Sequence, residues 1–156
     1  MSCVRLKKIG SLLGFCLCVL PVSVNFADGG GSGDSGGFAN SPLGPISELI
    51  EAQKYEEAIT DLQGLLEGSS DDPDVHNLLA FSYRQLNQYE EALMHYQLAL
   101  QIDPEHRGAN EYLGELYLKT HQLEKAKERL AVLDDACFFG CKEFDKLKAA
   151  IADYQE

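Results

Sequence analysis

Residues 73–106 read PDVHNLLAFSYRQLNQYEEALMHYQLALQIDPEH, and their pattern of small and large residues indicates the fold. Small residues stand at Ala80, Ala92 and Ala99, where they allow two helix backbones to approach closely. Large residues fill the space around these contacts. They are Leu79, Tyr83, Tyr96 and Leu100. The stretch therefore predicts two helices packed against each other and joined by a short turn.

A short segment of this stretch recurs at constant spacing. The segments KYEEA at 54–58, QYEEA at 88–92 and QLEKA at 122–126 follow one another every 34 residues. A fixed period of this length is typical of a helical repeat array. Counted from the middle repeat, the units are 39–72, 73–106 and 107–140.

The middle repeat matches the tetratricopeptide-repeat (TPR) pattern almost completely, and the chain resembles that family. The third repeat keeps most of the pattern, although Phe138 replaces the usual proline. The first is partial, because Pro42, Gly44 and Pro45 shorten its first helix. The resemblance implies an all-α array of about three repeats, with a concave face that binds peptides or protein segments.

After the third repeat, residues 141–156 carry one apolar stripe. The stripe consists of Phe144, Leu147, Ile151 and Tyr154. A helix of this kind covers the exposed end of a repeat array, so we expect a capping helix here. A dimerisation helix is the alternative.

The chain begins with two segments outside the repeats. Residues 1–27 combine basic residues with the apolar stretch 9–20, which is typical of a secretory signal peptide. Residues 28–44 are rich in Gly, Ser, Asp and Asn and predict a flexible linker. The folded TPR domain is then expected at 45–140, in a periplasmic or secreted protein.

The chain is strongly acidic, with a formal net charge of −12. Removal of residues 1–27 takes away three basic residues, which leaves ten against 25 acidic ones and a charge of −15. Such a charge repels nucleic acids and anionic membrane surfaces. We therefore expect neither nucleic-acid binding nor membrane insertion of the mature chain.

In TPR proteins the binding groove comes mainly from the first helix of each repeat. The chaperone-binding members of the family use a carboxylate clamp of Lys and Asn, and this clamp is absent here. Glu111 and Glu115 lie four residues apart and favour a basic or mixed partner, with Phe81 as an apolar contact. The groove residues implied by position are Asn77, Phe81, Arg84, Gln85, Glu111, Glu115, Leu118 and Lys119.

Cys137 and Cys141 are the two cysteines that remain after signal cleavage. An even pair in an oxidising compartment indicates a disulfide. Residues four apart on a regular helix lie too far apart for that bond, so the bond requires the helix to break, and Gly140 can supply the break. Small exported bacterial TPR proteins look similar at this point. A metal site or a redox-active thiol pair is the alternative.

Catalytic chemistry is not indicated by any motif. His76, His95, His106 and His121 occupy different repeat positions, and no ligand set for a metal or cofactor is recognised. The tyrosines at 55, 83, 89, 96 and 117 occupy repeat core positions. We therefore expect a non-enzymatic protein-interaction adaptor in the cell envelope, without a cofactor. A thiol-redox or metal-handling factor using the cysteine pair is the alternative.

Overall fold

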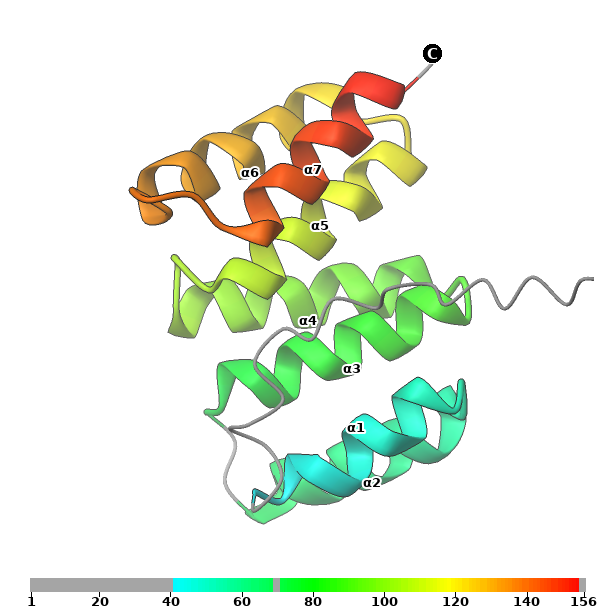
Figure 1. Ribbon diagram of the computed structural model, residues 1–156. Helices are drawn as coiled ribbons and strands as arrows, with labels where there is room; N and C mark the ends of the chain where they lie inside the picture. The colour runs from blue at the N-terminus through cyan, green and yellow to red at the C-terminus, as the bar shows by residue number, and fades with distance from the viewer. Residues whose placement is uncertain (1–40, 69–70, 155–156) are drawn as a thin grey trace, which may run out of the picture. The chain divides into compact units, whose positions relative to one another are not determined.

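The computed structural model describes residues 41–68 and 71–154, which belong to one compact unit. These residues form seven α-helices and no strand, which confirms the all-α fold class (Figure 1). The helices are α1 (Leu43–Glu51), α2 (Tyr55–Gly68), α3 (Pro73–Gln85), α4 (Tyr89–Ile102), α5 (Arg107–Lys119), α6 (Leu123–Ala136) and α7 (Lys142–Asp153). The expected signal peptide and positions 28–40 of the expected linker lie outside the described residues.

The same turn joins the two helices of all three repeats. Gln53, Asn87 and His121 have φ angles of 59°, 60° and 58°, and they are 34 residues apart. The residue after each of these three donates its backbone N–H to a carbonyl five residues earlier in the chain. In the middle repeat this hydrogen bond joins Gln88 to Tyr83 at 2.9 Å, and the other two turns have the equivalent bond. The sequence period is thus also a period of backbone conformation, and it includes the partial first repeat.

The N-terminus of α3 marks where the middle repeat begins. At α3, Asp72 caps the helix by accepting a hydrogen bond from the backbone N–H of Asp74 at 2.9 Å, and Pro73 fits the first turn. The helix α1 begins at Leu43, two residues before the expected domain boundary at 45. It has nine residues, whereas α3 and α5 have 13 each.

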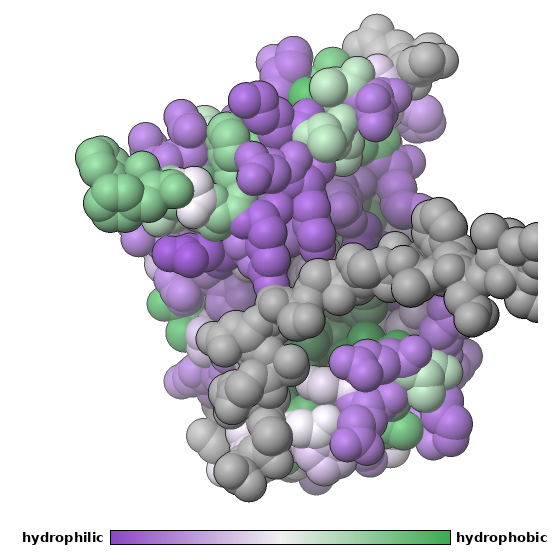
Figure 2. Space-filling model, viewed as in Figure 1, coloured by the Kyte–Doolittle hydropathy of each residue, from purple (hydrophilic) through white to green (hydrophobic). Residues whose placement is uncertain are grey.

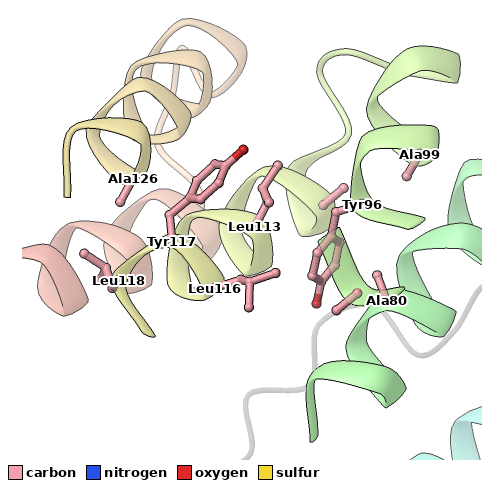
Figure 3. Close-up of a cluster of buried hydrophobic side chains, with 10 residues drawn as sticks. Ala80, Tyr96, Ala99, Leu113, Leu116, Tyr117, Leu118 and Ala126 are labelled. Carbon is pink, nitrogen blue, oxygen red and sulfur yellow. The ribbon is translucent and has the colours of Figure 1, made fainter. Parts of the chain in front are cut away.

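The core forms where the predicted small residues allow close packing. Ala80, Ala92, Ala99 and Tyr96 are completely buried. Figure 3 shows that side chains of α3, α4, α5 and α6 contribute to this cluster. Of the tyrosines expected in the core, Tyr96 and Tyr117 are buried, whereas positions 55, 83 and 89 are only partly buried. A second cluster joins α1, α2 and α3.

The helix α7 packs against both α5 and α6 and covers the last repeat (Figure 1). Its Leu147 is completely buried and lies over Gly114 of α5. A Cβ atom at position 114 would lie 2.5 Å from Leu147 Cδ2, so only glycine leaves room for this contact. The predicted stripe of α7 is therefore a docking surface within the chain.

Candidate protein-binding face

The residues expected in the groove lie on two helices that touch each other. Although α4 separates them in sequence, α3 and α5 are in direct contact. We call their shared surface the α3–α5 face. The helix α3 contributes Asn77, Phe81, Arg84 and Gln85, and α5 contributes Glu111, Glu115, Leu118 and Lys119.

Arg84 is the centre of the α3–α5 face. Its Nη1 atom donates a hydrogen bond to Glu115 Oε2 at 2.6 Å, across 31 positions of sequence. Its guanidinium carbon lies 5.4 Å from the ring centre of Phe81 and 5.3 Å from that of Tyr112. The Arg84 side chain is only 6% exposed, so these contacts hold it in one position.

A row of aromatic rings crosses this surface. The ring of Phe81 lies 6.4 Å from Tyr55 at the start of α2 and 5.1 Å from Tyr112 of α5. All three residues are partly exposed. Sequence reasoning found Phe81 but missed its two neighbours, because Tyr55 and Tyr112 belong to other repeats. We call these three residues the aromatic row.

Burial keeps part of this surface in its neutral form. It raises the pKa of Tyr112 to about 12, because the phenolate would lose solvation and would lie near Glu111. The amide oxygen of Asn77 and the Nε of Arg84 are buried, and neither has a hydrogen-bond partner in the described part of the chain. These atoms are less well satisfied than is usual in a protein interior.

Glu111 does not lie on an open surface, contrary to the expectation from sequence. It is 2% exposed, and its Oε1 lies 3.5 Å from Lys146 Nζ on α7. Burial raises the pKa of Glu111 to about 7, although the nearby Lys146 acts in the opposite direction. Its burial follows from the docking of α7 on α5, which covers this part of the helix.

The other expected groove residues divide into core and surface. Leu118 is a core residue instead of a groove residue, because it is 8% exposed and belongs to the main hydrophobic cluster. Partly buried residues of α7 pack against the same cluster. Gln85 and Lys119 are exposed. Asn77 is also buried, at 7% exposed. Of the eight expected residues, Leu118, Glu111 and Asn77 therefore offer little surface to a partner, whereas the buried Arg84 supports the face through its contacts with Phe81 and Glu115.

The cysteine pair lies in the loop between α6 and α7. The two Sγ atoms are 2.09 Å apart, and the Cα atoms of Cys137 and Cys141 are 5.6 Å apart. The helix breaks here as expected, since α6 ends at Ala136 and Gly140 has a φ of 83°. In the described residues, no three His, Cys, Asp or Glu side chains gather as metal ligands would.

Two histidines that the sequence placed in separate positions meet in the structure. The Nδ1 atoms of His76 on α3 and His95 on α4 are 3.0 Å apart, and the rings are stacked. Burial lowers the pKa of His95, and the charge of His76 lowers it further. The pair therefore favours a state in which at least one ring is neutral.

One cavity lies apart from the α3–α5 face. It has a volume of about 160 Å³ and is lined mainly by apolar atoms of α4 and α5. Tyr89 and Leu93 form one wall, and Leu116 and Tyr117 form the other. None of the eight expected groove residues lines it.

None of the described helices combines the length and apolar character that a bilayer crossing requires.

The described part of the chain consists of helix pairs that repeat every 34 residues, and α7 packs against the last pair. This arrangement is that of a helical-repeat protein. The family model described as the tetratricopeptide repeat matches residues 73–106. Residues 73–106 therefore contain a tetratricopeptide repeat, and the described helices have the tetratricopeptide-repeat fold, as the sequence pattern predicted.

Similar proteins are known by sequence and by structure. The "Uncharacterized protein ycf37" of Guillardia theta is 36% identical over 55 residues, which are 35% of this chain and 31% of that protein. This chain thus matches about a third of the relative's length.

Two solved structures share the fold. The TPR domain of Sgt2 from Aspergillus fumigatus has 21% identity and a TM-score of 0.65, over 73% of this chain and 74% of that one. The type III secretion chaperone SycD of Yersinia enterocolitica, in complex with a peptide of the translocator YopD, has 18% identity and a TM-score of 0.62. That match covers 72% of this chain and 86% of SycD.

Proposed function

We propose that this protein is a non-enzymatic interaction module that binds an extended segment of a partner protein on the aromatic row. The fold supports this function, because SycD, which has the same fold, was solved with a peptide of its translocator. The aromatic row carries the proposal for this chain. Rings from α2, α3 and α5 lie side by side and remain partly exposed.

The row is held ready for binding by the residues beneath it. Arg84 contacts Phe81 and Tyr112 and is itself held by Glu115. Side chains that are already fixed lose little conformational entropy when a ligand binds. Partly exposed aromatic residues are also those that contribute most to binding in protein interfaces. An apolar side chain of the partner segment would lie against Phe81.

The charge of the face favours a partner of mixed composition. A strictly basic segment would compete with Arg84 for Glu115. The exposed Lys119 and Gln85 border the face and add a positive and a neutral group. We therefore propose a segment that carries both polar and apolar side chains, without an excess of Lys and Arg.

The proposed place of action is the periplasm or the cell exterior. The support is the signal-like sequence of residues 1–27, together with a cysteine pair in bonding position. Mass spectrometry of the protein recovered from its own host tests this. Loss of residues 1–27 and a mass two hydrogens below that of the dithiol are expected. An intact start or two free thiols would contradict export or the disulfide.

Quantitative co-purification tests the binding face. The tagged full chain and its Phe81→Ser variant are expressed in the native host, and co-purified proteins are compared by mass spectrometry. Tyr89→Ser is the matched control, because Tyr89 is a partly buried aromatic residue at the cavity, away from the row.

The binding partner should be lost with Phe81→Ser and retained with Tyr89→Ser. We expect the purified partner to bind the Phe81→Ser variant about 30-fold more weakly, as is usual for an aromatic anchor. Equal binding to both variants would show that the row is not the site. Circular dichroism of each variant establishes that the helices remain formed.

A further inference from the structure

The loop between α6 and α7 presents two aromatic side chains to solvent. Phe138 is 86% exposed and Phe139 is 97% exposed. Figure 2 shows the hydrophobic patch that this loop forms at the edge of the molecule. Their rings contact each other edge to face, with centres 5.1 Å apart. We call these two residues the Phe-Phe tip.

The neighbouring hydrophobic core is packed without the two phenylalanines of the tip. The helices on both sides of the loop already bury their apolar side chains, since Leu133 of α6 and Leu147 of α7 are completely buried, and Cys137 is 8% exposed. Burial of a phenylalanine ring is ordinarily favourable, so two exposed rings forgo a considerable gain in stability. Exposed patches of this kind commonly mark interaction sites.

The loop is built to hold the rings outward. The cysteines close it at both ends, with their Sγ atoms 2.09 Å apart. Inside it, the backbone N–H of Gly140 donates to the carbonyl of Cys137 at 2.6 Å. With φ at 83°, Gly140 has a conformation that other residues rarely adopt. A short closed loop limits the ways in which the rings could fold back.

The charges around the tip indicate what it contacts. Asp134 and Asp135 are exposed at the end of α6. At the start of α7, Lys142 Nζ lies 3.8 Å from Glu143 Oε1, and the carboxylate of Glu143 offsets the positive charge of Lys142. The surface next to the Phe-Phe tip is therefore acidic, as is the whole chain. An anionic membrane surface or a second copy of this acidic chain would be repelled.

We propose that the Phe-Phe tip is a second interaction site, which inserts into an apolar pocket bordered by Lys or Arg on a partner protein. The pocket takes the two rings, and its basic border faces Asp134 and Asp135. This site is separate from the aromatic row and does not depend on ligand binding there. The chain would then join two proteins, one on each site.

Photo-crosslinking from the tip identifies the contact. The full chain, with p-benzoylphenylalanine in place of Phe139, is expressed in its native host and irradiated. The expected adduct is a protein whose cross-linked region contains an apolar pocket next to Lys or Arg. Adducts only with lipid, only with a second copy of the chain, or with nothing at all would overturn the proposal.

Binding of the purified cross-linked partner then tests the chemistry. Phe138→Ser/Phe139→Ser should weaken binding about 100-fold or more, as for two aromatic anchors. Asp134→Asn/Asp135→Asn should weaken it less and reduce its salt dependence. Met94→Ser is the matched control, because Met94 is a 50% exposed hydrophobic residue on α4, and it should leave affinity unchanged.

Two outcomes of these measurements would refute the tip as a site. One is equal affinity of the double serine variant and the wild-type chain. The other is a loss of affinity for Met94→Ser as large as that for the double variant. The tip is fully exposed, so the serine variants should keep the thermal stability of the wild type. Phe81→Ser should leave this affinity unchanged, which separates the two sites.

Discussion

The burial of Glu111 under α7 can be tested by the pH dependence of stability. A carboxyl group buried at the α5–α7 contact should destabilise the fold when it ionises. Its pKa rises from the ordinary value of 4.5 to about 7 because it is buried. The folded chain therefore holds this proton at pH values where the unfolded chain has released it. The contribution of Glu111 to stability is thus present at low pH and is lost as the pH rises through about 7.

The magnitude follows from the two pKa values. Integration of the proton linkage from about pH 5.5 to about pH 8.5 predicts that Glu111 lowers the free energy of unfolding by about 2 kcal/mol. Glutamine has nearly the same size and does not ionise. The stability of Glu111→Gln relative to the wild type should therefore increase by about 2 kcal/mol over this range.

Urea denaturation followed by circular dichroism at both pH values measures this difference. Glu128→Gln serves as the control, because Glu128 is exposed on α6 and its replacement also removes one negative charge. The reasoning would be refuted if the relative stability of Glu111→Gln changed by less than about 0.5 kcal/mol between the two pH values. An equally large change in Glu128→Gln would assign the effect to net charge.

Three further predictions concern stability, each measured by urea denaturation. Leu147→Ala should cost about 3 kcal/mol, because it empties the contact that docks α7 on α5. Gln53→Gly should stabilise by about 0.5–1 kcal/mol, because its positive φ suits glycine, and Asn87→Gly should gain less. The pKa of His95 is lowered in the folded chain, so its contribution to the free energy of unfolding is present above about pH 6.5 and is lost as the pH falls. A change from about pH 7.5 to about pH 5.5 should therefore destabilise the wild type more than the His95→Phe variant.

Each of these predictions has an outcome that would contradict it. A loss of less than about 1 kcal/mol for Leu147→Ala would mean that α7 contributes little to the array. A destabilised Gln53→Gly would show that this turn does not have the left-handed conformation. Equal pH dependence of the wild type and His95→Phe would remove the histidine pair as a source of acid sensitivity.

The binding face was only partly predictable from sequence. The repeat position placed Phe81, Arg84 and Glu115 on first helices, and in the structure these three residues contact one another as a group. The pattern did not identify Tyr55 and Tyr112 as their neighbours. A repeat motif shows which side of its own helix a residue occupies, but contacts between repeats depend on how successive helix pairs are rotated against each other.

The repeat array was predictable from the residue pattern alone. The 34-residue period and its alanines require paired helices, because only small side chains allow the backbones to approach. Which residues remain accessible depends on the packing of the helices and could not be read from that pattern. The docking of α7 on Gly114 buries Glu111, whereas Phe138 and Phe139 in the α6–α7 loop remain outside the core. Burial depends on what covers a helix face, and that covering comes from residues distant in sequence.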